Sequence, residues 1–303
     1  MTVAVSQEQF TREQLFNILR HINYPLENPD ELPKPTYETL RELEYRCVTS
    51  IPFETLSLRL TKAREVDITL QGIYDRIINQ HRGGWCFSLN KLAYELLRGL
   101  GFTVQFTIAR VCKPLNYGDP IRFQMLSHRV SIVRLKDGSK YLFDIGFGNT
   151  SFYPIPLKEG AVVEYFGHKR RMSKTVHNEA QPELLGNPPQ QLWLMEEYLG
   201  EDKWVPCYAF TEDQFYEIDC EMGNFYTCHS PKSVFYSSFW CVQATLDGKI
   251  YMLLDKQFKI RTATGNVETI VFTKEQDRLD ALEKYFGIVL TEEELKYHDQ
   301  KIE

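Results

Sequence analysis

The 303-residue sequence lacks several features that would assign it to a common functional class. No apolar run approaches the roughly 20 residues that a membrane-spanning helix needs. Its 35 Lys and Arg residues are outnumbered by 41 Asp and Glu residues, and the resulting net charge of −6 argues against nucleic-acid binding. The N-terminal stretch MTVAVSQEQFTREQL lacks the basic region of a signal peptide. We therefore expect a cytoplasmic protein that binds neither membranes nor nucleic acids.

Motifs for common cofactors and metals are also missing. The sequence contains neither a Walker A motif nor a G-x-G-x-x-G motif that follows a strand. Cys207, Cys220, Cys228 and His229 lack the close C-x-x-C spacing of structural zinc sites, so we assign no metal. Seven scattered cysteines in a chain without an export signal predict reduced thiols rather than disulfides.

The order of hydrophobic patterns predicts helices first, then strands, then a mixture of both. Apolar residues recur at helical spacing over residues 10–19, 36–48 and 86–100. From 101 to 211 the alternation of apolar and polar residues indicates a β-rich domain, either a barrel or a curled sheet. The last ninety or so residues mix strands with a helix over 274–286, and Thr291 with Glu294 predicts a capping box for a final short helix.

A basic stretch in the β-rich part is a weaker candidate for anion binding. The stretches HKRRMSK and AQPELLGNPPQ, between residues 168 and 191, are predicted to be surface loops. A solvated charged loop is the favoured interpretation. Contact with phosphates is the alternative, and it would use the side chains of His168, Lys169, Arg170, Arg171 and Lys174.

The stretch HRGGWCFSLN, residues 81–90, contains the strongest candidate nucleophile. Gly83 and Gly84 permit a close approach of the backbone just before Cys86, which begins the predicted helix. A helix N-terminus favours the thiolate form of a cysteine, and its N–H groups can stabilise an oxyanion. The alternative is that Cys86 is a small buried apolar residue.

A cysteine nucleophile needs a base, and the base needs a group that orients it. His128 opens a predicted strand, and Asp144 lies within YLFDIGFG, an apolar stretch predicted to form the next strand, where a carboxylate is costly unless it is paired. Taken separately, the two residues fit a histidine at a strand edge and a capped strand end. Together with Cys86 they have the order Cys, His, Asp of a catalytic triad.

The turn between these two strands decides whether His128 and Asp144 can meet. A two-residue loop would set Asp144 opposite Ser131, on the sheet face away from His128. A three-residue loop pairs Leu135 with Ser139 and brings Asp144 to the face of His128. We therefore predict a three-residue turn with Gly138 left-handed, or a bulge of equivalent effect.

Five stretches, spread over nearly the whole chain, resemble the arylamine N-acetyltransferase family. They are RGGWCFSLN, HRVSIV, DIGFGN, IPFETL (residues 51–56) and SPKSVFYSSFWCVQATLDG (residues 230–248). The resemblance implies an α+β fold with a cysteine-protease-like Cys-His-Asp core. It would comprise a helical domain over 1–100, a β-barrel domain over 101–211 and an α/β lid over 212–303.

The resemblance also implies roles for particular residues. Cys86, His128 and Asp144 match the catalytic residues, and Phe53 and Phe147 match aromatic residues that line the acceptor pocket. Binding of the acyl-coenzyme A donor is implied for Ser237 and Gly148, and a supporting ion pair for Arg82 and Glu54. Two positions depart from the family: Ser88 stands where Glu or Gln is usual, and Thr55 stands where the family pattern has Asn.

The implied activity is N-acyl transfer by a ping-pong mechanism through a Cys86 thioester. The donor would be acetyl-CoA or, as in some fungal members, malonyl-CoA, whose carboxylate would need a cation such as Arg110 or Arg129. The acceptor would be a small arylamine or hydrazine. A cysteine hydrolase of the papain or transglutaminase type and a non-catalytic relative that binds coenzyme A or another ligand remain alternatives. The sequence does not determine an oligomeric state.

Overall fold

The computed structural model describes residues 9–113, 118, 120–148, 151–181, 186, 188–262, 265, 267–298 and 301–302. Its helices are α1 (Arg12–His21), α2 (Tyr37–Ser50), α3 (Ser57–Leu60), α4 (Leu70–Tyr74), the π-helical η1 (Asp75–Asn79), α5 (Cys86–Gly99), α6 (Glu217–His229), α7 (Val234–Ser237), α8 (Glu275–Phe286) and α9 (Glu292–Tyr297). Its strands are β1 (Phe53–Glu54), β2 (Thr103–Cys112), β3 (Phe123–Arg134), β4 (Lys140–Phe143), β5 (Ile155–Pro156), β6 (Val162–Tyr165), β7 (His168–Val176), β8 (Gln191–Tyr198), β9 (Trp204–Phe210), β10 (Trp240–Ala244), β11 (Ile250–Leu254), β12 (Gln257–Arg261) and β13 (Val267–Val271).

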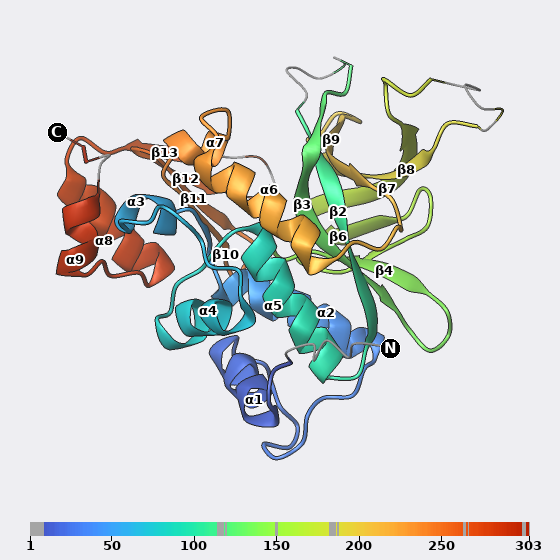
Figure 1. Ribbon diagram of the computed structural model, residues 1–303, viewed down its shortest axis with the longest axis horizontal. Helices are drawn as coiled ribbons and strands as arrows, with labels where there is room; N and C mark the ends of the chain where they lie inside the picture. The colour runs from blue at the N-terminus through green and yellow to red at the C-terminus, as the bar shows by residue number, and fades with distance from the viewer. Residues whose placement is uncertain are drawn as a thin grey trace, which may run out of the picture.

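The N-terminal helices follow the predicted apolar spacing. Helix α5 buries Leu89, Leu92 and Leu96 against the largest hydrophobic core, and its chain turns away through Gly101 at φ +83°. At the C-terminal end of the chain, the predicted capping box of Thr291 and Glu294 begins α9. In Figure 1 α5 crosses the middle of the molecule beside α6, with the strands of the larger sheet on one side and β10 to β13, α8 and α9 on the other. Helix α5 therefore joins the parts of the fold at their centre.

Eight strands form one antiparallel sheet in the order β5-β4-β3-β2-β9-β8-β7-β6. The sheet curls, because β5 also contacts β7 (Figure 1). Where β2 passes from Ala109 to Arg110, its partners in β3 pass from His128 to Leu126, so Ser127 is unpaired and β3 bulges next to His128. Together with the helices, this sheet gives the predicted α+β fold.

A second sheet of five strands has the order β1-β10-β11-β12-β13. Its first strand comes from the helical part of the chain, since Phe53 pairs with Val242 and Glu54 pairs with Cys241. The segment just before Cys86 also lies on β1, through a bridge between Phe53 and Gly84. Strand β1 thus links the C-terminal sheet to the start of α5.

The hairpin between β3 and β4 has the predicted three-residue turn. Ser131 pairs with Phe143 and Arg134 with Lys140, and Gly138 lies at φ +87°. The Leu135 N–H donates to the Ser139 carbonyl at 2.9 Å and closes the turn. The register prediction is therefore confirmed, and it brings the residue after β4 to the face of His128.

The prediction that YLFDIGFG forms one strand is wrong beyond Phe143, where β4 ends. After this point the backbone N–H groups bond to side chains instead of to a neighbouring strand. The Ile145 N–H donates to Asn90 Oδ1 and the Gly146 N–H donates to Asp144 Oδ1, each at 2.9 Å. A buried carboxylate needs such donors, and this requirement ends the strand.

The prediction of a surface loop at HKRRMSK is also wrong, because these residues form β7. His168 and Arg170 point inward and are buried, and Arg170 pairs with Glu197 of β8 at 3.0 Å. Arg171 pairs with Glu196 and Lys174 covers the Trp193 ring, while Lys169 pairs with Glu164. These basic side chains are engaged in contacts within the sheet and do not form a phosphate site. Residues 182–185 and 187 of the second predicted loop lie outside the described residues.

Within the described part of the chain, no helix is both long enough and apolar enough to cross a membrane.

Candidate active site

Cys86 is the first residue of α5, and the two glycines before it fit its turn against β1. A Cβ on Gly83 would lie 1.8 Å from the Pro52 carbonyl oxygen, so only glycine fits there. The Gly84 N–H donates to that carbonyl at 3.3 Å, and the Gly84 carbonyl accepts from the Glu54 N–H at 2.9 Å. The glycines therefore allow a strand-like contact that fixes the entry into α5.

His128 and Asp144 lie close together beneath the curled sheet. His128 Nε2 is 2.7 Å from Asp144 Oδ2, and both side chains are almost completely buried. The Cys86 thiol donates to the Ser127 carbonyl at 3.4 Å, and Cys86 and His128 line the same cavity. Of the three residues that sequence analysis selected, two are therefore joined by a direct bond and the third faces the same cavity as His128.

Electrostatic interactions favour the charged forms of His128 and Asp144. Burial alone would lower the pKa of His128, but the Asp144 charge and hydrogen bonds to Asp144 and Cys86 raise it above its ordinary value. Burial alone would raise the pKa of Asp144, but the His128 charge and hydrogen bonds from His128, Asn90 and Gly146 lower it. Both pKa shifts favour the pair of an imidazolium and a carboxylate.

Three residues that sequence analysis did not single out surround Asp144 and His128. Asn90 Nδ2 donates to Asp144 Oδ1 at 2.8 Å, and the Tyr208 ring packs against the His128 ring with the centroids 4.7 Å apart. Glu44 of α2 is buried and accepts from the Asp144 N–H at 3.4 Å. Asn90 had a signal in the sequence, because it lies one helical turn after Cys86 within an apolar stripe. Glu44 and Tyr208 are too distant in sequence to be recognised in this way.

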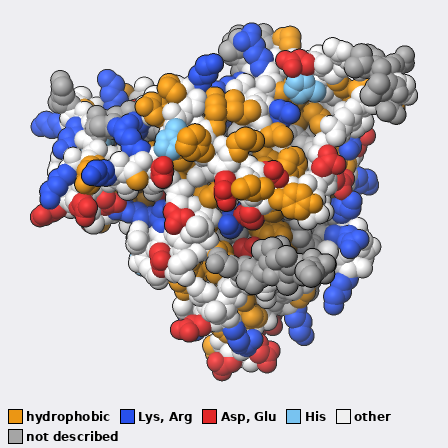
Figure 2. All heavy atoms as spheres, viewed as in Figure 1, with side chains coloured by type: hydrophobic (Ala, Val, Ile, Leu, Met, Phe, Trp, Pro, Cys, Tyr) orange, Lys and Arg blue, Asp and Glu red, His pale blue; other side chains and the backbone are white. Residues whose placement is uncertain are grey.

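A cavity of about 270 Å³ opens onto Cys86 and His128. Phe53 and Phe147 line it, together with Val111, Met125, Tyr226, Val234, Phe235 and Trp240. The Phe147 ring packs edge-on against His128, with the centroids 5.1 Å apart. Hydrophobic side chains continue over the surface of α6 (Figure 2), where Ile218, Met222 and Phe225 are exposed. The site is therefore a largely apolar slot beside the thiol.

Besides His128, the charged side chains among the described residues that line this cavity are two lysines: Lys113 follows β2 and Lys232 precedes α7. The two arginines proposed as partners for a malonyl carboxylate lie elsewhere. Arg129 is buried and forms two hydrogen bonds with Glu217, at 2.9 and 3.0 Å, while Arg110 donates to the Gln124 carbonyl at 3.3 Å. Neither arginine lines the cavity.

Two residues implied to meet the donor do not line the described cavity. Ser237 is an exposed residue at the end of α7, and the buried Ser233 lines the cavity instead. Gly148 has φ +78° and packs on Phe53, where a Cβ would lie 3.2 Å from the ring. Gly148 therefore supports the position of Phe53 from behind.

The predicted pair of Arg82 and Glu54 is replaced by other contacts. Arg82 bonds to both carboxylate oxygens of Glu294 in α9, at 2.6 and 2.8 Å, and to the Val289 carbonyl at 3.0 Å. Glu54 accepts from the Leu56 N–H, and Arg76 exerts the strongest charge attraction on it. The Arg82 side chain therefore pairs with Glu294, 212 residues along the chain, instead of with Glu54.

The two departures from the family pattern both have local partners. Ser88 Oγ donates to the Trp85 carbonyl at 3.1 Å within the first turn of α5. Thr55 Oγ1 donates to the Ser238 carbonyl at 3.2 Å and accepts from the Trp240 N–H at 3.0 Å. Thr55 thus fastens β1 to the start of β10, where the cavity wall begins.

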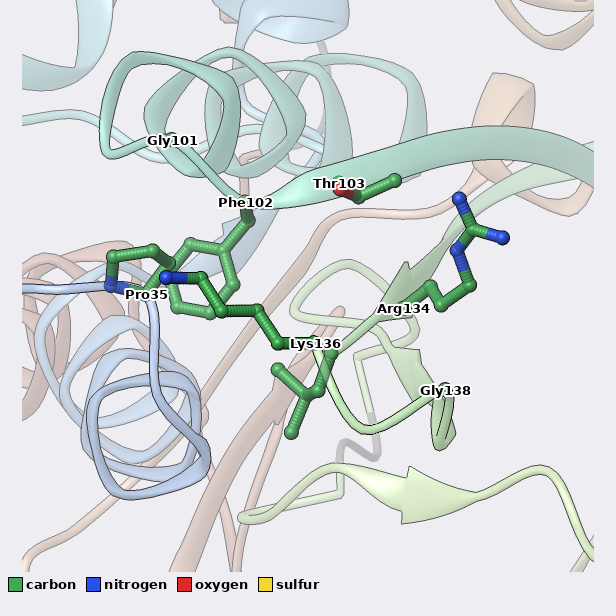
Figure 3. A pocket seen from close by; sticks show the side chains of 8 residues that line it. Pro35, Gly101, Phe102, Thr103, Arg134, Lys136 and Gly138 are labelled. Carbon is green, nitrogen blue, oxygen red and sulfur yellow. The ribbon is translucent and has the colours of Figure 1, made fainter.

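A second hollow, of about 250 Å³, lies beside the β3–β4 hairpin (Figure 3). Figure 3 shows Gly138 in the turn and Lys136 extending toward Pro35. None of Cys86, His128 and Asp144 lines this hollow. Among the described residues, no group of three His, Cys, Asp or Glu side chains is placed to hold a metal. The first cavity is therefore the candidate active site.

Comparison with known proteins points to one family. A family model described as N-acetyltransferase matches residues 36–295. An arylamine N-acetyltransferase of Mycolicibacterium smegmatis is 30% identical over 264 residues, covering 86% of this chain and 88% of the relative. The N-malonyltransferase FDB2 of Fusarium pseudograminearum is 26% identical over 269 residues, covering 81% and 76%. The solved arylamine N-acetyltransferase of Mycobacterium abscessus superposes with a TM-score of 0.80 at 25% identity, covering 94% and 93%.

Proposed function

Because the chain belongs to the arylamine N-acetyltransferase family and is an acyltransferase, we propose that it moves an acyl group from acyl-coenzyme A to an arylamine or arylhydrazine. The acyl group would pass through a thioester on Cys86. One observation carries the proposal: the Cys86 thiol lies on the wall of an apolar cavity together with His128, which is bonded to Asp144 at 2.7 Å. This arrangement supports a cysteine-protease-like core.

In the first half-reaction the Cys86 thiolate attacks the thioester carbonyl carbon of the donor. The carbon–sulfur bond to coenzyme A then breaks, and the departing thiolate takes the proton held by the His128 imidazolium. The raised pKa of His128 keeps this proton in place at neutral pH. Exchange of one thioester for another leaves the acyl group activated on the enzyme.

In the second half-reaction the amine nitrogen attacks the acyl carbon. The bond to Cys86 breaks, His128 takes a proton from the nitrogen, and the thiolate paired with imidazolium is restored. Asp144 fixes the orientation of the imidazole and stabilises its charged form. A flat, weakly basic aryl amine suits a slot lined by Phe53 and Phe147, because it enters uncharged.

The donor is proposed to be acetyl-CoA or malonyl-CoA. Lys113 and Lys232 line the cavity without an acidic side chain among its described lining residues, and they suit a donor that carries phosphates. One relative is an N-malonyltransferase and others are arylamine N-acetyltransferases. A panel of both donors, at equal concentrations with one arylamine, distinguishes them by rate.

We also propose the division into a helical domain (1–100), a β-barrel domain (101–211) and an α/β lid (212–303). The cavity takes residues from all three parts, such as Cys86, His128 and Phe235. The pairing of β1 with β10 means that the first and third parts also share a sheet. A cytoplasmic location is part of the proposal, supported by seven cysteines that are all free thiols.

Intact-protein mass spectrometry tests the proposed function. After mixing with either acyl-CoA and no amine, the wild type should gain the mass of one acyl group, and Cys86→Ala should gain none. Adding an arylamine should remove the acyl group and release the N-acyl product. Rapid formation of free acid without an amine would identify a hydrolase, and the absence of any acyl-enzyme would identify a binding protein without catalysis.

A further inference from the structure

We propose that Arg76 is a positioning residue for the nucleophile, because it fastens the Gly83–Gly84 turn that leads into α5. The proposal rests on the proposed function only in that Cys86 is taken as the nucleophile. Arg76 touches neither the thiol nor the cavity, and it acts through the backbone between them.

Arg76 holds two consecutive residues of the turn. Its side-chain Nε donates to the Gly83 carbonyl at 3.1 Å, and its own carbonyl accepts from the Arg82 N–H at 3.0 Å. Its Nη1 donates to the Asp67 carbonyl at 3.0 Å, which ties the turn to the loop before α4. The side chain is 8% exposed, so water competes little for these bonds.

The π-helical segment η1 supplies the local geometry. Its widened turn is closed by the Gln80 N–H, which donates to the Asp75 carbonyl at 2.9 Å, five residues earlier. The Arg76 carbonyl is thereby left to accept from Arg82 instead of from a residue of the helix. Single π-helical turns are found frequently at functional sites.

Glu54 provides the opposing charge on the other side of the turn. It lies on β1, whose N–H at Glu54 bonds to the Gly84 carbonyl, and it is 2% exposed. The Arg76 charge is the largest charge attraction acting on Glu54, and Glu54 is the largest acting on Arg76. The glycine turn is therefore held between a buried cation and a buried carboxyl group.

Arg82 is nearer to Cys86 in sequence, but its side chain points away from the turn to Glu294 and Val289. Of the two arginines, only Arg76 has a side-chain hydrogen bond to a glycine of the turn among the described contacts. If Arg76 is shortened, Gly83 loses its side-chain bond, and the turn keeps only its backbone bonds to β1 and to the Arg76 carbonyl. Cys86 would then shift relative to His128, and small displacements of reacting groups cost about 100-fold in rate.

The experiment compares Arg76→Met and Arg76→Lys with Arg278→Met. Arg278 is a control of matched burial, at 2% exposure, in α8, where it bonds to Glu275 and the Asp255 carbonyl. For each variant three quantities are measured: the melting temperature, the single-turnover rate of acylation by acetyl-CoA, and the rate of Cys86 alkylation by iodoacetamide against pH.

Arg76→Met should lower the acylation rate by about 10-fold to 100-fold and shift the alkylation profile, with a small change in KM for the donor. Arg76→Lys keeps the charge without the planar fork of donors and should lie between Arg76→Met and wild type. Arg278→Met should lower only the melting temperature. The proposal is overturned if a folded Arg76→Met or Arg76→Lys matches Arg278→Met in acylation rate and alkylation profile.

Arg76→Lys keeps the proposal testable if the methionine variant does not fold. The pH profile of alkylation separates the positioning role of Arg76 from the proposed function, because alkylation requires a reactive Cys86 but no acyl transfer. A wild type that is alkylated at Cys86 but never acylated contradicts the proposed function, while the effect of Arg76 on alkylation still decides the positioning role.

Discussion

At the end of β4, both oxygens of the Asp144 carboxylate accept hydrogen bonds, from His128 on one side and from Asn90 and Gly146 on the other. In the turn before α5, by contrast, Glu54 Oε1 and Arg76 Nη2 are buried without a hydrogen-bond partner among the described residues. Both regions meet at Cys86, and both rely on a buried carboxyl group. The Asp144 carboxylate is bonded at both oxygens, whereas Glu54 and Arg76 bond to the backbone and each keeps an unpaired side-chain atom.

This difference indicates what each region does. A carboxylate with satisfied oxygens stays ionised in a buried site and can stabilise a neighbouring imidazolium. Burial raises the pKa of Glu54, although the charges of Arg76 and Arg82 and the Leu56 N–H act against it. We therefore expect the Asp144 region to set the charge of the site and the glycine turn to set its position.

The largest expected effect on the acylation rate comes from replacing the carboxylates of Asp144 and Glu54 in separate variants. Asp144→Asn should lower the single-turnover acylation rate by about 10³-fold to 10⁴-fold, because an amide neither stabilises the imidazolium nor fixes the ring. Glu54→Gln should lower it by about tenfold or less, because the amide keeps the shape of the turn. Stopped-flow measurement of acylation compares the two.

Circular dichroism spectra and melting curves control for folding in this pair of variants. Equal losses of acylation rate in the two variants would contradict the distinction between the two regions, because the turn would then have the same electrostatic role as Asp144. A loss confined to Asp144→Asn supports the division into charge and position.

The residues around the hairpin between β3 and β4 show which contacts can be predicted from the sequence. Loop length and the period of two along strands were enough to predict that Asp144 lies on the face of His128, because both rules are local. Asn90 was within reach of the same kind of reasoning, at four residues from Cys86 along one helix face. What these positions share is that the interacting residues lie in one helix or in adjacent strands.

The incorrect predictions depend on partners that are distant in sequence. Arg170 and Met172 share the inward face of β7. The polar sequence HKRRMSK does not reveal this pattern, because it depends on Glu197 lying opposite Arg170. Arg82 turns from Glu54 to Glu294 for the same reason. A charged residue is buried or exposed according to its partner, and a single sequence does not show which partner the fold will supply.

The difference between the Asp144 region and the glycine turn concerns the chemical step. It can be tested more sharply if donor binding is shown to depend on other residues. Lys113 and Lys232 should attract the phosphates of coenzyme A, so Lys113→Ala with Lys232→Ala should raise KM for acetyl-CoA by about 3-fold to 10-fold. The acylation rate at saturating donor should stay within about twofold of wild type. Steady-state kinetics at two salt concentrations measure this, since screening should shrink the effect.

Lys62→Ala is the matched control, because Lys62 is exposed and does not line the cavity. An unchanged KM in the double variant would assign donor binding to other residues. A fall in the saturated rate would instead connect the lysines to the chemical step.

Glu44 offers a contrast with Asp144 within one region. Burial, followed by repulsion from Asp144, raises the pKa of Glu44 well above 4.5, so the folded protein keeps its proton. The unfolded chain releases this proton above pH 4.5, so the folded state binds more protons and loses stability as pH rises. Glu44→Gln removes that loss and keeps an oxygen that accepts from the Asp144 N–H.

Glu44→Gln should therefore raise the free energy of unfolding at pH 8 by about 1 kcal/mol or more, with little gain at pH 4. Urea unfolding at the two pH values measures the difference. A stability gain that is the same at both values, or a loss at pH 8, would show that Glu44 is ionised in the folded protein. The acylation rate should change by less than about threefold.

The smallest effect tests whether the incomplete bonding of the glycine turn can be repaired. Ser88 Oγ and Arg76 Nη2 both flank Gly84, at 2.3 and 3.5 Å from the position of a Cβ there, so a longer acceptor at position 88 is within reach of the unpaired nitrogen. Ser88→Gln should gain about 0.5–1 kcal/mol in the free energy of unfolding by bonding Nη2. Ser88→Ala, which loses only the bond to the Trp85 carbonyl, is the control. A loss of 1 kcal/mol or more in Ser88→Gln would show that packing around this buried position is closed, and that the turn keeps its unpaired donor because no side chain fits beside it.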